Sequence, residues 1–467
     1  MPSLPDTIRH VDAYRAVWRW HFYAGLLVLP FLILLAITGG LYLFHQEIEN
    51  AWYRDLKQVQ VATTPTLAPS ALTQSAQRAY PGTLAKYLPP AAPDKAAQVV
   101  IKPDTGDSLS VYVNPYDGHV LGALPERGTL MWTIRRLHSL DYFGPIANGA
   151  IEIAAGWSVL LVLTGLYLWW PRGRKQGVIS IRGTPAKRVF WRDTHAVTGA
   201  VAGFFILFLA VTGMPWSLVW GAKVNQWANG NNFGYPAGVR VALPMSDEHL
   251  AHMGQTSWSL EQARMPESAP SHAMGEPIGL DAAVRAFNRL DLAPGYAINV
   301  PQSPTGVYTA SVYPNDLVRQ RVVHLDQYSG QPLLDMSYAD YGPLGKALEW
   351  GINVHMGQEF GLANQLILVA ACLAMVLMSI AAAAMWWKRR PTGSLGIPPM
   401  PAARGALRGV MVLMIIGGVI FPLVGASLLV MLVLDLIVQR LTRRDTRRVP
   451  SAPVESALEH RPSRSNS

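Results

Sequence analysis

The sequence predicts a membrane α-helical bundle in which a helix–soluble domain–helix unit occurs twice. This duplication gives a four-helix transmembrane core, two soluble α+β domains and a C-terminal hydrophobic extension. Three observations predict this class. Half of the 467 residues are hydrophobic and only 15% are charged, which is too apolar for an ordinary soluble enzyme. Basic residues flank long apolar segments, and histidines and glycines recur at the same spacing in both halves.

The net charge and the cysteine count exclude several classes of function. The charge of +9 comes largely from basic residues beside apolar segments, so it indicates a lipid bilayer and not a nucleic-acid partner. The single cysteine, Cys372, lies inside an apolar run. Disulfides, cysteine-ligated zinc and iron–sulfur clusters are therefore excluded within this chain.

The apolar segments are long enough to cross a hydrocarbon core of about 30 Å. In chain order we expect a cytoplasmic N-terminus at 1–21, transmembrane helix 22–45, a soluble domain at 51–130, transmembrane helix 138–170 with an outer histidine segment, a cytoplasmic loop at 171–193, transmembrane helix 194–220, a second soluble domain at 221–345, transmembrane helix 355–387 with an outer histidine segment, a hydrophobic helix or hairpin at 409–438 and a disordered tail at 449–467.

The distribution of basic residues predicts the topology. Arginines precede the first apolar segment and the acidic HQEIEN follows it, so the N-terminus is expected in the cytoplasm. The loop 171–193 holds seven Lys or Arg residues against one acid, which also indicates the cytoplasm. Both soluble domains are then expected on the side of the membrane opposite this loop. For 409–438, a single span would place the basic tail outside, whereas a kinked or re-entrant hairpin would keep it inside, and the sequence leaves both open.

The two halves share more than their order of elements. The soluble stretches contain a common nine-residue pattern, VNPYDGHVL at 113–121 and LDQYSGQPL at 325–333. In the helical segments, the separation of His138 from Trp170 equals the separation of His355 from Trp387. Matched spacing in both kinds of segment supports a duplicated unit.

Four histidines at the ends of apolar segments are candidate cofactor ligands. His21 and His195 are each followed by a glycine one helical turn later and by a Thr-Gly dipeptide, which stands at 38–39 and 212–213 and thus at the same distance from both. His138 and His355 are matched at the opposite ends of the other two spans. Residues related by the repeat can face each other and supply two axial nitrogens to one metal, so we expect two bis-histidine haems at opposite depths. His45, at the outer end of the first span, is a fifth candidate.

Simpler interpretations remain for these residues. A histidine at a membrane boundary is often an interfacial side chain that only makes hydrogen bonds, and duplication can copy such a residue. Ionisable groups within spans nevertheless indicate function, and five boundary histidines favour ligation. Arg19 and Arg192 precede the cytoplasmic histidines and are equally consistent with binding haem propionates or with setting topology.

The motifs RWHFYAG, RLHSLDYFG, FWRDTHAVTG and NVHMGQEFG, with the two Tyr-x-Gly hairpins, resemble the PepSY-associated transmembrane helix family over roughly residues 10–440. Its members include iron-regulated membrane proteins and siderophore reductases of bacterial inner membranes. The resemblance implies periplasmic PepSY-like domains, two haem b groups and reduction of a ferric siderophore to release iron. By motif it assigns the axial iron ligands to His21, His195, His138 and His355. His45 lacks a histidine counterpart near Val219 and can replace an outer ligand.

This interpretation predicts no acid–base or nucleophilic catalytic residue, because reduction itself weakens a hard-oxygen chelate. The sequence contains no strand–GxGxxG–helix unit, so electrons are expected from a separate cytoplasmic or membrane donor. Other functions stay open. The soluble domains could restrain a peptidase without enzymatic activity, the helices could form a haem conduit to another acceptor, or the chain could be a siderophore permease.

Overall fold

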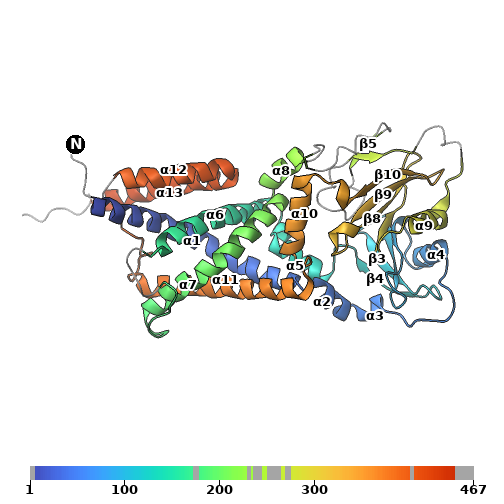
Figure 1. Ribbon diagram of the computed structural model, residues 1–467, viewed down its shortest axis with the longest axis horizontal. Helices are drawn as coiled ribbons and strands as arrows, with labels where there is room; N and C mark the ends of the chain where they lie inside the picture. Colours follow the sequence, from blue (N-terminus) through green and yellow to red (C-terminus); the bar gives the residue numbers. More distant parts are fainter. Residues whose placement is uncertain are drawn as a thin grey trace, which may run out of the picture.

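The computed structural model describes residues 6–171, 178–228, 233–234, 245–249, 264–268, 275–399 and 404–446. Long helices form a bundle, and a β-sheet lies at the end of the bundle opposite the N-terminus (Figure 1). The predicted tail at 449–467 lies outside the described residues.

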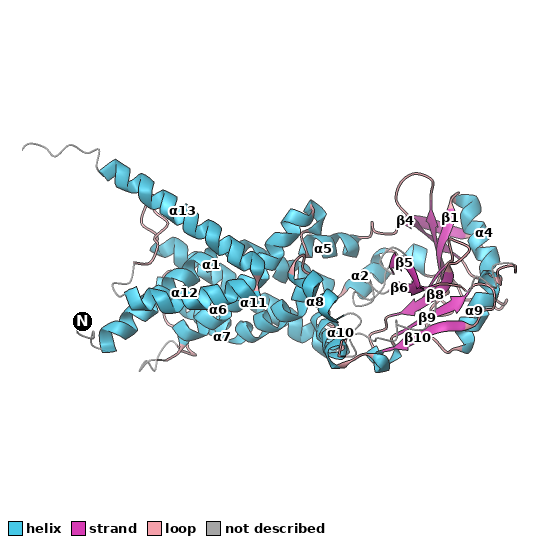
Figure 2. Ribbon diagram, turned by 90° about the horizontal axis from the view of Figure 1, so that it is seen from above, coloured by secondary structure: helices cyan, strands magenta, loops and turns pink. Residues whose placement is uncertain are grey.

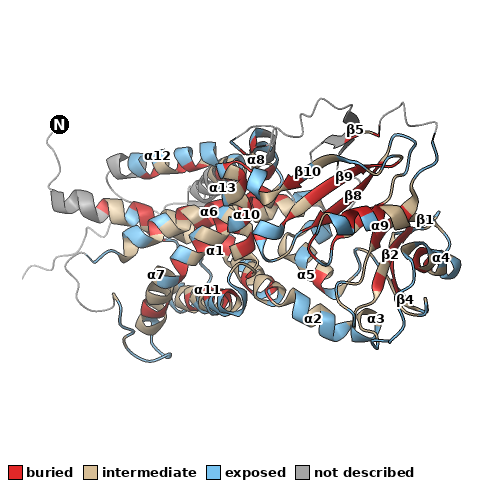
Figure 3. Cartoon of the chain, turned by 45° about the vertical axis from the view of Figure 1, so that its right-hand side comes forward, coloured by how far each residue is buried: buried red, intermediate tan, exposed pale blue. Residues whose placement is uncertain are grey.

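Four helices of the described chain are long and apolar enough to cross a membrane, as the sequence predicts. They are α1 (Asp6–Tyr42), α6 (Pro145–Trp169), α7 (Arg188–Gly213) and α11 (Gly361–Arg389). Exposed residues recur along the spanning helices (Figure 3). They include large apolar side chains such as Phe204 and Leu373, which only lipid can solvate. The chain is therefore a membrane protein.

The structure refines the ends of three predicted segments. Helix α1 begins at Asp6, so the segment predicted as a cytoplasmic N-terminus is helical over its described part. The outer histidines do not begin spanning helices. Each is the last residue of a short separate helix, α5 (Leu130–His138) or α10 (Pro343–His355). Left-handed backbone at glycines breaks the chain before the span, with φ of 92° at Gly144 and 56° at Gly361.

The two soluble stretches form one antiparallel sheet of eight strands, in the order β10-β9-β8-β7-β1-β2-β3-β4. The strands are β1 (Thr83–Leu88), β2 (Ala97–Lys102), β3 (Leu109–Val113), β4 (Val120–Pro125), β7 (Ala297–Asn299), β8 (Val307–Val312), β9 (Arg321–Asp326) and β10 (Pro332–Ser337). Strands β1 and β7 join the halves, with Lys86 opposite Asn299 and Tyr87 opposite Ile298. The predicted domains 51–130 and 221–345 are thus continuous through their backbone hydrogen bonds.

The two repeated nine-residue patterns form hairpins with matching hydrogen bonds. In the first, the Tyr116 amide donates to the Asn114 side chain and the Tyr116 hydroxyl donates to the Pro93 carbonyl. In the second, the Tyr328 amide donates to Asp326 and its hydroxyl donates to the Pro304 carbonyl. Each hairpin then turns through a glycine with positive φ, 73° at residue 118 and 68° at residue 330.

Helices α4 (Pro69–Ala79) and α9 (Gly279–Arg289) cover the face of the sheet that points away from the bundle (Figure 2). Alternate strand residues point into this layer, and one apolar core runs across both halves, including Val99, Ile298 and Phe287. The two helices are also joined directly, because the backbone amide and hydroxyl of Ser70 both donate to Asp281.

The other face of the sheet points toward the bundle. Helices α2 (His45–Trp52), α3 (Arg54–Lys57) and α5 lie between this face and the spanning helices (Figure 1). The remaining described elements are η1 (Asp141–Phe143), η2 (Met214–Trp216), α8 (Trp220–Ala228), β5 (Met245–His249), β6 (Arg264–Pro266), η7 (Leu317–Arg319) and η8 (Tyr338–Asp340).

The C-terminal hydrophobic segment is a helical hairpin of α12 (Arg404–Ile420) and α13 (Pro422–Thr446) beside α1 and α6 (Figure 1). At the turn, a Cβ on Gly418 would lie only 2.8 Å from the Cα of Gly425, so the two helices meet closely there. The apolar parts of both helices are shorter than the roughly 20 residues of a span. Of the two arrangements open for 409–438, the structure has the hairpin.

A buried histidine makes the sheet sensitive to acid. His324 on β9 bonds to Thr309 at 2.9 Å, and burial lowers the pKa of His324 to about 4 from 6.5. The unfolded chain therefore takes up a proton first, so stability is full above pH 6.5 and falls as the pH drops toward 4, by up to about 1.4 kcal/mol per pH unit. We expect His324→Gln to flatten this slope in denaturant unfolding followed by circular dichroism. The exposed His119→Gln serves as the control, and equal slopes for both variants would refute the assignment.

Candidate metal-cofactor site

Two histidines from α1 and α7 face each other inside the bundle. The ring centres of His21 and His195 are 6.4 Å apart, and the ring planes are inclined by 73°. A metal lies about 2 Å from each ligating imidazole nitrogen, so two axial imidazoles have ring centres roughly 6 Å apart. The separation of this inner pair therefore suits one metal between the rings.

The other nitrogen of each inner imidazole contacts a neighbouring helix. His21 Nδ1 lies 2.9 Å from the Thr164 hydroxyl on α6. His195 Nδ1 lies 3.1 Å from the Met378 carbonyl on α11. A carbonyl can only accept, so the His195 Nδ1 carries the proton and its Nε2 keeps the lone pair that a metal needs.

The outer pair is held in the same way by the opposite ends of α1 and α7. His138 Nδ1 lies 2.9 Å from the Thr38 hydroxyl, and His355 Nδ1 lies 2.9 Å from the Thr212 hydroxyl. His138 is also among the groups that act electrostatically on His355. The structure thus places these two imidazoles close enough to act on each other electrostatically.

The three threonines fix the imidazole tautomers. Each hydroxyl donates its only proton to the carbonyl one turn earlier in its own helix: Thr38 to Leu34 at 2.6 Å, Thr164 to Leu160 at 2.8 Å and Thr212 to Phe208 at 2.7 Å. Each threonine oxygen must then accept from the histidine Nδ1–H. All four imidazoles are therefore assigned a free Nε2, the arrangement in which a second group orients a metal ligand.

The glycine after each of these threonines makes room for the ring. A Cβ on Gly39, Gly165 or Gly213 would lie 3.2, 3.3 or 3.3 Å from the Cε1 of His138, His21 or His355, respectively. The dipeptide Thr-Gly therefore works as one unit, with a hydroxyl that accepts the Nδ1 proton and a glycine that admits the ring edge. Gly25 and Gly199, the glycines one turn after His21 and His195, lie instead against Leu161 and Met378.

The two histidine pairs lie at different depths in the bundle. On α1, His21 marks the inner level and Thr38 the outer level, and on α7 the same separation relates His195 to Thr212. At a helical rise of 1.5 Å per residue, the inner and outer levels are about 25 Å apart along each helix. One level lies near each end of the spanning segments.

The donor set fits a haem better than a bare ion. Among the described residues, no group of three or more His, Cys, Asp or Glu side chains can hold a metal ion. Protein zinc sites take three or four protein ligands, whereas a haem iron takes its in-plane nitrogens from the porphyrin and needs only axial ligands. Two imidazoles with free Nε2 atoms at each level meet that requirement.

His45 occupies a different environment. Its ring stacks on Tyr42, with ring centres 4.7 Å apart and planes inclined by 8°, and its Nδ1 donates to the Tyr42 carbonyl. It lines a cavity beneath the sheet together with Glu49 and Arg135. No described contact joins it to the outer pair, and its role as a replacement ligand stays a prediction.

The two arginines considered for haem propionates both have protein partners. Arg19 donates to the Pro398 carbonyl at 2.7 Å. Arg192 pairs with the buried Asp193 at 2.5 Å, and Arg182 pairs with the same carboxylate at 2.7 Å. A propionate would have to share these guanidinium groups with their present partners, so this role also stays a prediction.

Comparison with known proteins identifies one family. The sequence model described as PepSY-associated TM region matches residues 18–389, which include all four paired histidines and both halves of the sheet. No curated protein matches the chain at a significant level.

Two neighbouring glycines allow a matched test of the Thr-Gly contact. An alanine at Gly39 would press on the His138 ring at 3.2 Å, whereas an alanine at Gly40 would make an ordinary contact of 3.6 Å with Cys372. We expect Gly39→Ala to lower the total haem from two per chain toward one, because only the outer level is affected, and Gly40→Ala to leave the total unchanged. Pyridine haemochrome absorbance of the purified variants measures this, and equal haem contents would contradict the ring-contact role.

Proposed function

The chain belongs to the PepSY-associated TM region family, and we propose that it is a di-haem inner-membrane electron-transfer protein that reduces a periplasmic ferric siderophore to release iron. The observation that carries this proposal is the presence of two histidine pairs, one near each end of the spanning helices, with every Nδ1 engaged by the protein. Histidine pairs at a single depth could hold a cofactor for chemistry at that depth only. Pairs at two depths suit the transfer of an electron from one side of a membrane to the other.

The chain's own contribution is to orient the ligands. When bound, each haem supplies a ferric–ferrous couple for one-electron transfer. In this proposal His21 and His195 would hold the inner haem, and His138 and His355 would hold the outer one. The Thr-Gly units, and for His195 the Met378 carbonyl, hold the rings by accepting the Nδ1 proton, which also raises the basicity of the other ring nitrogen. Helix-borne contacts of this kind fix the rings more rigidly than a loop would.

We further propose that the chain is a duplicated helix–soluble domain–helix unit. The matching hairpin bonds of Tyr116 and Tyr328 support this, as does the palindromic order of the strands around the β1–β7 junction. The outer histidines support it too, since each is oriented by the threonine at the equivalent depth of α1 or α7.

The charge distribution supports a cytoplasmic N-terminus and a periplasmic sheet. The N-terminus lies at the end of the bundle opposite the strands (Figure 1). The basic residues of 178–193 precede α7 or lie in its first turns, and Lys388, Arg389 and Arg390 end or follow α11. Basic flanks of this kind stay in the cytoplasm, which leaves the sheet outside.

The proposed reaction needs no proton transfer or covalent intermediate. One electron from a separate cytoplasmic or membrane donor converts the chelated Fe³⁺ to Fe²⁺. Ferrous iron carries less charge and is softer, so the hard oxygen ligands hold it less well and iron is released. The protein has to position the chelate near the outer pair and exclude the wrong acceptors, and the sheet lies on that side of the bundle.

Reoxidation of reduced protein tests the activity. After anaerobic reduction by dithionite and removal of the excess, we expect a ferric siderophore to return the absorption spectrum to the oxidised form. His355→Ala should slow this at least tenfold, because it removes an outer ligand while leaving the inner pair intact. His119→Ala, an exposed hairpin variant, should behave like wild type. If no ferric complex of a hydroxamate, catecholate or carboxylate chelator reoxidises the wild-type protein, the acceptor is a different molecule.

Reporter fusions test the topology separately. Alkaline phosphatase fused after Gly118 or Gly330 should be active, because both hairpins would be periplasmic, and a fusion after Arg182 should be inactive. Green fluorescent protein at the same positions gives the complementary readout. The same result at Gly118 and Arg182 would rule out the four-span topology.

A further inference from the structure

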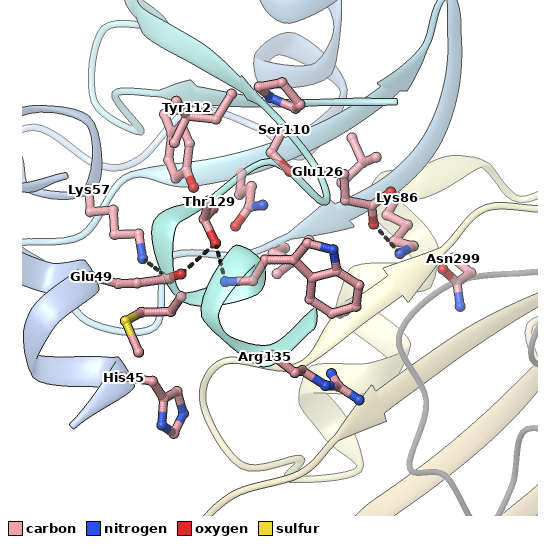
Figure 4. A pocket seen from close by; sticks show the side chains of 18 of the residues that line it. His45, Glu49, Lys57, Lys86, Ser110, Tyr112, Glu126, Thr129, Arg135 and Asn299 are labelled. Atoms are coloured by element: carbon pink, nitrogen blue, oxygen red, sulfur yellow. Dashed lines mark hydrogen bonds and ion pairs between the residues drawn. The ribbon is translucent and has the colours of Figure 1, made fainter. Parts of the chain in front are cut away.

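A cavity of about 330 Å³ lies between the bundle-facing side of the sheet and helices α2 and α5 (Figure 4). Strands β1 to β4 and β7 contribute the side chains that alternate with the apolar core, so the cavity lies on the opposite side of the sheet from α4 and α9. Its volume is at the lower end of the range of small-molecule sites. None of the four paired histidines lines it.

Charged side chains line this cavity. Lys86 and Glu126 form an ion pair of 2.5 Å, with side chains only 9% and 21% exposed. Lys57 and Glu49 form a second pair at 3.0 Å. Burying charges is costly even when they are paired, so an apolar sheet surface here would have been simpler to fold. The charges are better explained by a polar ligand than by stability.

One buried polar atom in the cavity has no partner among the described residues. The Oδ1 of Asn299 makes no hydrogen bond, although the residue is only 2% exposed. Asn299 lies opposite Lys86 across the β1–β7 junction, and both line the cavity (Figure 4). A buried acceptor without a donor costs about 1–3 kcal/mol. A ligand with an N–H or O–H group at this place would satisfy it.

Helix α5 connects the cavity to the outer histidine pair. Trp132 and Arg135 line the cavity, and His138 lies one turn beyond Arg135 on the same helix. Residues at this spacing lie on one helical face, about 4.5 Å apart along the axis. Both lining carboxylates already pair with lysines. Arg135 is an exposed residue whose guanidinium makes a cation–π contact with Trp132 at 4.9 Å.

From this arrangement we propose that the cavity binds a small anionic carboxylate-type chelate of a trivalent metal that also carries an O–H or N–H donor. Three cationic side chains against two carboxylates give the lining a net positive charge, which favours an anion. The donor group would satisfy Asn299, and Arg135 would pair with a carboxylate. That the anion is a trivalent-metal chelate, and that it is then reduced, rests on the proposed function. That the cavity takes a small anion with a donor group rests on its lining and on Asn299.

Gallium(III) citrate tests binding alone, because gallium carries the charge of ferric iron but is not reduced under these conditions. Isothermal titration of the full-length detergent-solubilised protein should show one site. Arg135→Gln should weaken the affinity for gallium citrate about tenfold or more, since a charge-assisted hydrogen bond is lost. Asn299→Leu, which keeps the shape without polar atoms, should weaken it several-fold. The matched control is Arg136→Gln, because Arg136 pairs with Asp141 and does not line the cavity, and it should bind like wild type.

Several results would overturn the assignment. These are no binding to wild type, equal weakening by Arg135→Gln and Arg136→Gln, binding of free citrate as tight as that of its gallium complex, or equally tight binding of the gallium complex of a cationic trihydroxamate. The two proposals can fail separately. Gallium citrate binding that depends on Arg135, with no reduction of ferric citrate, would contradict the proposed reductase activity and leave the cavity site standing. Reduction of a siderophore that Arg135→Gln does not affect would contradict the cavity site and leave the reductase activity standing.

Discussion

The hydrogen bond from each histidine Nδ1 to a neighbouring helix is the interaction on which the candidate site depends. An imidazole without it could carry its proton on either nitrogen and rotate about χ2. With Thr38, Thr164, Thr212 or the Met378 carbonyl as acceptor, each ring has one tautomer and one direction. The same bonds tie α1 to α5 and α6 and tie α7 to α10 and α11, so positioning the ligands and packing the helices are one constraint.

Much of the fold could be predicted because membrane spans and repeats leave strong patterns in a sequence. The four spans follow from hydropathy, and the matched hairpins follow from the Tyr-x-Gly pattern. Strand β1 was not predicted, because Lys86 interrupts its apolar alternation, and that lysine faces the cavity. The joining of β1 to β7 depends on backbone pairing between residues far apart in the sequence, and no local pattern encodes it.

The four histidines of the candidate site could be selected from the sequence, whereas the groups that hold their rings were missed. Histidine spacing pointed to His21, His195, His138 and His355, and the structure brings the inner two within 6.4 Å. The sequence also showed Thr-Gly at 38–39 and 212–213, yet Thr164-Gly165 belongs to the same set. A search for every Thr-Gly in an apolar helix would have found it. The Met378 carbonyl could not have been found, because any residue type supplies a carbonyl.

Because one acceptor is a backbone carbonyl, the four rings differ in how sensitive they are to mutation of their acceptors. The spacing that relates His138 to His355 puts Ala381 where the first half has Thr164, so the fourth acceptor comes from the main chain of α11. A point mutation can remove a threonine hydroxyl but cannot remove a backbone carbonyl. Substitution of Met378 therefore leaves the acceptor of His195 in place. Insertions, deletions or a proline that shifts the register of α11 would instead displace it. The two halves of this protein can accordingly accumulate different kinds of change while keeping the same ligand geometry.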